Sequence, residues 1–307
     1  MQLKKIPLPF CGVALGFAAL GNLLSTYSFG PLVKNICGGI SVFILIILII
    51  KFLTDMNGFK EDMKNPIMAS VFGTFSMAMM ILGGYQVPHP AFAKALWCLG
   101  IIIHLILIIY FTMTFVVKFD LKKVFASWFI VYVGIVASSI NSKALGMQNL
   151  GQIFFWFGFI AVLILLVVVT KRYLTLKEIP DPAKPIFCIY TAPVSLCLAG
   201  YMQAFDQKNA VLIYFMAMLS ILLYIIVLIN LPKFLSLPFF PSYAAFTFPF
   251  VISAIAIKMA TNFFNNVNPG LASVTKILFN IQTWIAVVLV VYTLLRYLGF
   301  IFSKPNK

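Results

Sequence analysis

Charged side chains are scarce in this sequence. They make up 9% of the 307 residues and only seven of them are acidic, whereas hydrophobic residues make up 63%. A soluble domain of ordinary composition carries about 25% charged residues. The chain therefore lacks the polar side chains that would cover a water-exposed surface, and it is predicted to be an integral membrane protein.

The five cysteines show no spacing typical of a metal site or a redox pair. No CxxC or Cys/His pattern is present, and each cysteine lies within or at the end of an apolar run. A disulfide framework, a metal centre and a bound cofactor are therefore not indicated. We expect these thiols to be buried and inert.

Acidic residues are missing from the middle of every apolar run. Proton relays and cation sites in membranes usually need a buried carboxylate, so a cation channel is disfavoured and a proton-coupled mechanism is weakened. The sequence also has no HExxH motif and no Ser, Asp or His constellation of an intramembrane hydrolase, so we predict no enzyme activity. Of the two histidines, His89 falls in a predicted loop and His104 in a predicted span, where packing is the favoured role.

Apolar runs of the length that crosses a bilayer are abundant. About 20 residues are needed, because about 30 Å of hydrocarbon is crossed at 1.5 Å per residue. The gaps between the runs are short and rich in Pro and Gly, so residues 1–307 are predicted to form a single transmembrane domain. The ten predicted spans are 8–28, 32–53, 66–85, 92–116, 125–142, 149–170, 184–205, 209–230, 241–262 and 270–302.

The distribution of Lys and Arg predicts the orientation of these spans. With a cytoplasmic N-terminus, 16 of the 22 basic residues fall on the cytoplasmic side and six on the other. Because cytoplasmic loops carry the excess of positive charge, both termini are predicted to be cytoplasmic. An even number of spans agrees with that orientation.

The odd and even spans differ in composition. Even spans contain long aliphatic runs such as 40–52 and 99–109, whereas odd spans carry Gly, Pro, Ser and Thr. Gly and Pro are common in any membrane helix, so only their recurrence in every second span is informative. Small residues permit close helix approach, and proline is tolerated where protein or a water-filled cavity satisfies the backbone. The pattern predicts five helical hairpins, with odd helices inside around a central pore and even helices outside.

A neutral inner ring with positive charge at both faces favours the passage of anions. Hydroxyl groups, kinked backbone and the ends of helices would form its wall. Lys258 and Lys276 are candidates for the outer mouth of the pore, although either side chain would equally extend to lipid headgroups.

The odd spans carry five motifs in order along nearly the whole chain. These are Pro7-Leu8-Pro9 with 12–22, Asn65-Pro66 through 74–77, Ser127-Trp128-Phe129 with 133–135, 192–201, and Ala245-Phe246-Thr247-Phe248-Pro249-Phe250. With these motifs the chain resembles the tellurite-resistance (TehA) and C4-dicarboxylate transporter family, which includes sulfite exporters and the plant guard-cell slow anion channel.

This resemblance implies a homotrimer in which each protomer encloses its own pore. It also implies that the aromatic residue of the Thr-Phe-Pro motif, Phe248, projects into the pore and blocks it. Pro249, directly after it, disrupts the helix and can set the direction of the ring. Val131 stands where the family pattern has proline, so the kink of the fifth span is in question.

The sequence therefore predicts a gated, passive channel for small monovalent anions such as chloride and nitrate, in a bacterial inner membrane. Selectivity would follow dehydration cost, because no charged group clamps the ion. The alternative is a secondary transporter of dicarboxylate, sulfite or tellurite-type oxyanions, for which Lys258 is the one candidate basic group. The residues predicted to shape the pore are Pro9, Gly16, Gly73, Gly134, Pro193 and Pro249.

Overall fold

The computed structural model describes residues 5–27, 29–85 and 90–303, which form helices and no strand. The predicted loop residue His89 lies outside these ranges. The α-helices are α1 (Phe10–Leu24), α2 (Gly30–Thr54), α3 (Met56–Lys64), α4 (Pro66–Gly83), α5 (Pro90–Phe111), α6 (Trp128–Val133), α7 (Ala137–Ser142), α8 (Gln148–Thr175), α9 (Ala192–Ala204), α10 (Ala210–Leu235), α11 (Phe248–Val267) and α12 (Pro269–Phe302). A π-helical turn, η2 (Thr112–Val116), and the 3-10 helices η3 (Leu121–Lys123), η4 (Gly134–Val136), η5 (Asp181–Thr191) and η6 (Pro241–Phe246) complete the set.

Eight helical stretches are long and apolar enough to cross a membrane. Two shorter apolar stretches, Phe10–Leu24 and Trp128–Ser142, lie between them in the chain. Each predicted span overlaps one of these ten stretches. The eight long stretches are Gly30–Thr54, Pro66–Gly83, Pro90–Val116, Gln148–Thr175, Asp181–Ala204, Ala210–Leu235, Pro241–Val267 and Pro269–Phe302. The prediction of an all-helical membrane protein is confirmed.

Helix α3 occupies a gap that the sequence analysis left without structure. Asp55 caps its N-terminus by accepting a hydrogen bond from the Gly58 N–H at 3.3 Å. The Phe59 ring packs against Phe52 and Phe72, at centroid distances of 4.7 and 5.2 Å. An Asn-Gly pair such as Asn57-Gly58 ordinarily favours a turn, but the cap and these aromatic contacts stabilise a helix here.

Burial separates the helices into an inner and an outer set. In Pro66–Gly83, Asp181–Ala204 and Pro241–Val267, 78–89% of the residues in the most apolar window are buried, against 28–39% in the five long even-numbered spans. Nearly all of α1 and of Trp128–Ser142 is buried as well. The inner segments are the ones rich in Gly, Pro, Ser and Thr, because small residues allow close packing on every side.

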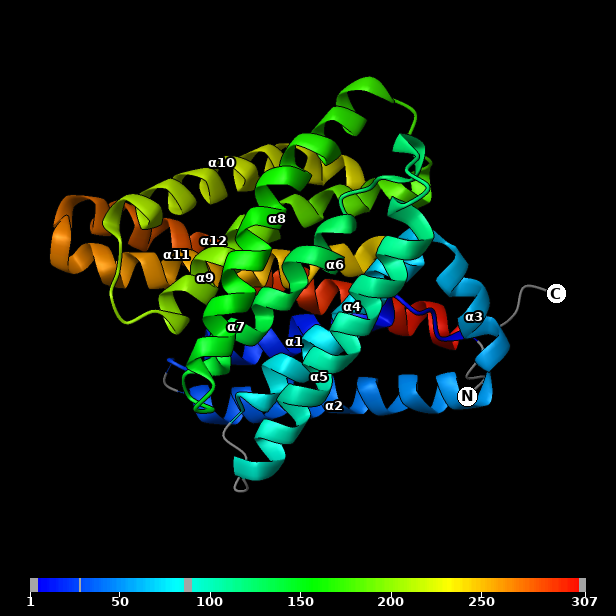
Figure 1. Cartoon of the computed structure of the whole chain (residues 1–307), viewed down its shortest axis with the longest axis horizontal. Helices are drawn as coiled ribbons and strands as arrows, with labels where there is room; N and C mark the ends of the chain where they lie inside the picture. The colour runs from blue at the N-terminus through cyan, green and yellow to red at the C-terminus, as the bar shows by residue number, and fades with distance from the viewer. Residues whose placement is uncertain (1–4, 28, 86–89, 304–307) are drawn as a thin grey trace.

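The inner segments form a closed ring. Helix α1 contacts α4, α4 contacts α6 and α7, α7 contacts α9, α9 contacts α11, and α11 returns to α1. Each inner segment also packs against the helix that follows it, so that α2, α5, α8, α10 and α12 lie outside the ring. Figure 1 shows α2 and α10 along opposite edges of the molecule, with α1 and α4 between them.

The first and last described residues meet at one end of the molecule. The Lys5 Nζ donates a hydrogen bond to the Ser303 carbonyl at 3.2 Å. The Lys51 Nζ, at the end of α2, donates to the carbonyl of Ile6 at 2.5 Å. Both ends of the described chain therefore lie at the same end of the molecule, as an even number of membrane crossings requires.

Candidate functional site

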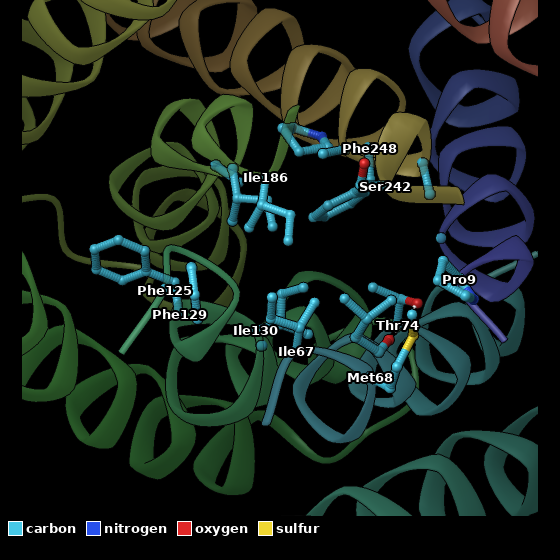
Figure 2. A pocket seen from close by; sticks show the side chains of 18 of the residues that line it. Pro9, Ile67, Met68, Thr74, Phe125, Phe129, Ile130, Ile186, Ser242 and Phe248 are labelled. Atoms are coloured by element: carbon cyan, nitrogen blue, oxygen red, sulfur yellow. Dashed lines mark hydrogen bonds between the residues drawn. The ribbon is translucent and has the colours of Figure 1, made fainter. Parts of the chain in front are cut away.

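A cavity of about 270 Å³ lies inside the ring, at the end where the inner segments begin. All five inner segments contribute to its lining. Pro9 and Gly12 lie at the start of α1, and residues 67–77 belong to α4. Further lining residues fall within 125–134 at the start of the third inner segment, 183–196 in η5 and α9, and 241–249 in η6 and α11. Figure 2 shows these side chains converging from different helices. The cavity exists because five helix beginnings, several of them opened by proline, meet there.

The wall of this cavity is mostly apolar and carries no charged side chain among the described lining residues. Its polar members are Asn65, Thr74 and Ser242. The Thr74 hydroxyl donates to the Val71 carbonyl at 2.8 Å, and the Asn65 Oδ1 accepts from the N–H of Ile67 at 2.9 Å. Asn65 and Thr74 are engaged with their own helix, whereas the Ser242 hydroxyl oxygen is buried and has no hydrogen-bond partner among the described residues. One uncharged hydroxyl on an apolar wall offers an ion weak interactions rather than a tight site.

Phe248 is the first residue of α11 and lines the cavity. In Figure 2 its ring projects into the open space between Ile186 and Ser242. The Thr247 hydroxyl, directly before it, donates to the carbonyls of Gly12 at 2.9 Å and Ala244 at 2.7 Å. Thr247 thereby joins α11 to α1 and fixes the direction in which Phe248 leaves the backbone.

The cavity gathers five of the residues singled out in the sequence, namely Pro9, Gly134, Pro193, Phe248 and Pro249. Gly16 and Gly73 lie behind the wall. A Cβ on Gly16 would come within 2.5 Å of the Thr247 Cβ, so Gly16 allows α1 to approach the segment that carries Phe248. A Cβ on Gly73 would meet Ile130 at 2.9 Å and the His104 ring at 3.3 Å.

Lys258 is not among the lining residues of the cavity. It lies ten residues beyond Phe248 in α11, about 15 Å along the helix axis. Its ammonium group donates to the Thr26 hydroxyl and lies 5.7 Å from the centre of the Tyr27 ring. This basic side chain therefore belongs to the opposite end of the ring.

The sequence analysis did not identify the contribution of η5. Pro180 and Pro182 line the cavity together with Ala183, Ile186 and Ile189. The sequence 180–182 suggested only a loop, but Pro182 lies within an 11-residue 3-10 helix that also contains Pro185. Three prolines spaced two and three residues apart could have predicted a departure from the α-helix here, because proline lacks the N–H that a regular α-helix needs.

Comparison with family sequence models gives one match, described as voltage-dependent anion channel, over residues 5–298. The chain belongs to the voltage-dependent anion channel family. Comparison with curated proteins gave no match. Family membership confirms the resemblance seen in the inner-span motifs. It identifies the chain as a multi-pass membrane protein with anion channel activity, in a family of channels and transporters rather than enzymes.

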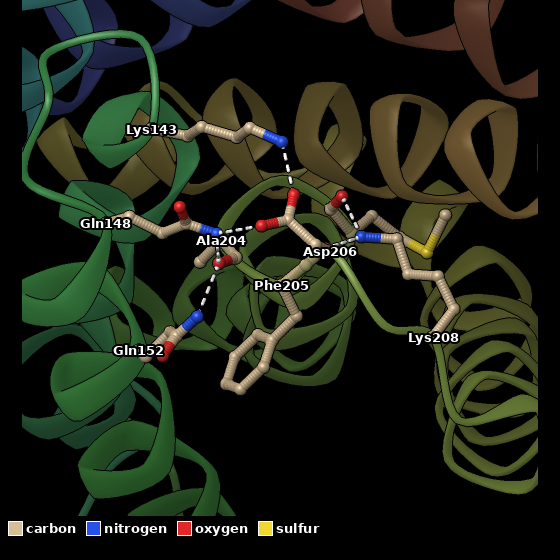
Figure 3. Close-up of polar contacts among 8 residues, drawn as sticks. Lys143, Gln148, Gln152, Ala204, Phe205, Asp206 and Lys208 are labelled. Atoms are coloured by element: carbon tan, nitrogen blue, oxygen red, sulfur yellow. Dashed lines mark hydrogen bonds and ion pairs between the residues drawn. The ribbon is translucent and has the colours of Figure 1, made fainter.

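In this family member, charged contacts gather at the end of the ring opposite the cavity (Figure 3). The Lys143 ammonium binds the Asp206 carboxylate, and the Gln148 Nε2 donates to Asp206 Oδ2 at 2.9 Å. These bonds hold the pKa of Asp206 below its usual value, the Lys143 bond being the largest cause. Gln152 donates to the Ala204 carbonyl at 3.0 Å, so α8 is tied to the end of α9.

The same end carries Lys208, whose ammonium donates to the carbonyls of Met202, at 2.7 Å, and Phe205. Partial burial lowers the pKa of Lys208. In the described part of the chain, no group of three His, Cys, Asp or Glu side chains is placed to hold a metal ion. The charged groups here join loops to one another.

Proposed function

We propose that this chain is a gated, passive channel for small monovalent anions, in which Phe248 occludes a neutral pore. The observation that carries the proposal is the ring of Phe248, which projects into a cavity enclosed by all five inner segments (Figure 2). Removing this one aromatic side chain would open the cavity toward the opposite end of the ring of inner segments. Steric occlusion by an apolar group is an established way of closing a pore.

The proposed architecture is one transmembrane domain of ten spans, arranged as five hairpins, with both termini in the cytoplasm of a bacterium. The closed ring of inner segments and the contact between Lys5 and Ser303 support it. The shorter stretches Phe10–Leu24 and Trp128–Ser142 bring the number of spans to ten. They can be shorter than the other spans because outer helices shield them from lipid. We also propose a homotrimer with one pore in each protomer, as the family resemblance implies.

Selectivity in this proposal follows the cost of removing water from the anion. The lining residues carry no charge, so the wall repays little of a large dehydration penalty. Chloride and nitrate should therefore pass more readily than strongly hydrated divalent anions. Coupled transport of dicarboxylate, sulfite or tellurite-type oxyanions would call for a basic group in the pore, and Lys258 contacts Thr26 instead.

The test is chloride and nitrate flux into liposomes for the native protein and the Phe248→Ala variant. We expect the variant to conduct strongly and the native protein to be nearly silent. Phe250→Ala is the matched control, because Phe250 is buried in the same helix, packs 5.6 Å from Tyr224 and does not line the cavity. Silence of all three proteins, together with saturable uptake driven by a dicarboxylate or sulfite gradient, would replace the channel with a transporter.

A further inference from the structure

The fifth segment of the chain, which is the third of the five inner segments, is broken although it contains no proline. It consists of helix α6, the 3-10 turn η4 and helix α7. The last α-helical hydrogen bond of α6 runs from the Gly134 N–H to the Ile130 carbonyl. The carbonyl of Val131 is the first one past that bond, and a buried carbonyl without a donor destabilises a membrane protein.

The donor for that carbonyl comes from another helix. His104, in the outer helix α5, is fully buried, and its Nε2 lies 3.0 Å from the Val131 carbonyl oxygen. Its Nδ1 lies 2.7 Å from the Ser76 hydroxyl of α4. A carbonyl only accepts hydrogen bonds, so Nε2 carries the hydrogen. In the neutral ring Nδ1 is an acceptor and takes the single hydroxyl hydrogen of Ser76, which is then not donated to the Gly73 carbonyl 2.9 Å away.

Two glycines make room for the imidazole. A Cβ on Gly134 would lie 2.9 Å from the His104 Cε1, and one on Gly73 would lie 3.3 Å from the same atom. Both distances are shorter than an ordinary carbon contact. The ring therefore fills a slot between α4 and the broken segment, and Gly134 is at once a wall of the slot and a wall of the cavity.

We propose that His104 is a positioning residue that holds the break in the fifth segment and so sets the cavity wall at Gly134. A side chain that inserts into the hydrogen-bond ladder is one of the recognised causes of a helix kink. His104 thus maintains in this segment the kind of break that a proline would otherwise cause. Its effect on conduction rests on the proposed channel function, whereas its hydrogen-bonded state does not.

Loss of the imidazole donor would allow the Ile135 N–H to bond to Val131 and the α-helix to continue. A 3-10 helix turns by about 120° per residue and an α-helix by about 100°, so the residues of η4 would rotate. Gly134 is the smallest residue possible at the wall. Val133 already lines the cavity beside it. Rotation in either direction replaces Gly134 at the wall with more of Val133 or with the bulkier Ile135, and conduction should fall.

The first arm of the test measures the imidazole itself. The chain has two histidines, His89 and His104, so ¹⁵N NMR of histidine-labelled protein in bilayers gives two ring systems, and a His89→Gln variant assigns them. We expect the Nε2 of His104 to carry a hydrogen that is donated to a carbonyl oxygen. A ring without hydrogen on Nε2 overturns the proposal whatever the flux.

The second arm measures chloride flux in the Phe248→Ala background. Glutamine places an amide N–H close to the position of Nε2, whereas leucine fills similar space without a donor. His104→Leu should reduce flux by about tenfold, which equals about 1.4 kcal/mol. His104→Gln should retain most of the flux, since the carbonyl of Val131 keeps a donor.

Each other outcome of the second arm has a defined meaning. If Leu and Gln variants both conduct like the parent, or both lose conduction, the hydrogen bond is not what positions the segment and the proposal is wrong. If the Phe248→Ala parent itself does not conduct, the proposed channel function fails. In that case the NMR arm still decides the role of His104, together with hydrogen exchange of the Ile135 amide. New protection of that amide in the Leu variant but not in the Gln variant supports the proposal, and equal protection in the two variants overturns it.

Discussion

Single atoms decide how closely α1 approaches the segment that carries Phe248. Gly16 has no side chain, and the Thr247 side chain occupies the space that a Cβ would need. Thr247 in turn donates to the Gly12 carbonyl one helical turn earlier. The orientation of Phe248 therefore depends on a glycine that never touches the cavity.

Two glycine-to-alanine variants test this contact, because their expected effects on protein stability have opposite signs. A Cβ on Gly39, in the exposed part of α2, meets nothing within 4 Å, so Gly39→Ala should stabilise α2 by up to about 1 kcal/mol. Gly16→Ala places a Cβ 2.5 Å from the Thr247 Cβ and should destabilise the protein by about 1–3 kcal/mol. Thermal unfolding in detergent measures both changes. Equal melting temperatures for the two variants would contradict the close approach.

At the scale of elements, the connections opposite the cavity are held by charged and polar contacts as well as by the packing of Phe205 against Phe155 and Tyr201. Lys143 follows α7, Gln148 opens α8, and Asp206 follows α9. All these side chains are exposed or only partly buried, so their interaction should respond to pH and salt.

Acidification should release this charged contact. The folded-state pKa of Asp206 lies below its ordinary value, about 3.9. The stabilisation is therefore fully present above about pH 4 and is lost as pH falls through the lower, folded-state pKa. Hydrogen exchange of 143–148 and 205–209, corrected for intrinsic rates, should rise in the native protein on acidification. Asp206→Asn should show the raised exchange already at pH 7, with no further rise in acid; protection equal to the native protein's at pH 7 would contradict this prediction.

The sequence predicts the elements well where composition differs strongly between neighbours. Small residues in every second run identified the inner helices, because packing on all sides excludes long aliphatic chains. Pro249 was predicted to disrupt the last inner helix, and α11 begins just before it. The break at Gly134, in a segment without proline, was left open. The 3-10 turn at Gly134 depends on a histidine 30 residues earlier in the chain, and Gly16 depends on Thr247, so both features arise only when distant segments meet.

The candidate site was partly accessible from sequence. Phe248 was identified through the Thr-Phe-Pro motif, and it lines the cavity; its role as a gate stays a prediction. Nothing in the local sequence distinguishes Gly134, on the wall, from Gly73, behind it. Lys258 was a candidate for the mouth on charge alone, and its contact with Thr26 was not readable from spacing.

At the scale of the whole molecule, a net charge of +15 surrounds a cavity without charge. Most basic side chains are exposed, where water screens them. Arg172 is buried, 3% exposed, with its guanidinium 4.6 Å from the centre of the Phe125 ring, and Phe125 lines the cavity. Its Nη1 donates to the Leu176 carbonyl at 2.9 Å, and no ion pair of the described residues includes it.

A buried cation without a carboxylate beside it acts over a longer distance than an exposed one. In the Phe248→Ala background, Arg172→Gln should lower the preference for chloride over potassium, seen as a reversal potential closer to zero in a salt gradient. Lys184→Gln is the control, because Lys184 lies at the same end, has a half-exposed side chain and pairs with Asp181 at 2.5 Å. Equal shifts in the two variants would assign selectivity to overall charge instead.

The ring of inner segments closes between α11 and α1, its last and first members. Synthesis proceeds from the N-terminus, so the enclosing wall is incomplete until the final hairpin has entered the membrane. Phe248 begins that same hairpin. A nascent chain thus has an open-sided groove rather than a conduit. In the proposed channel, the hairpin that closes the groove also carries the side chain that obstructs it, so no unobstructed conduit would exist at any stage of assembly.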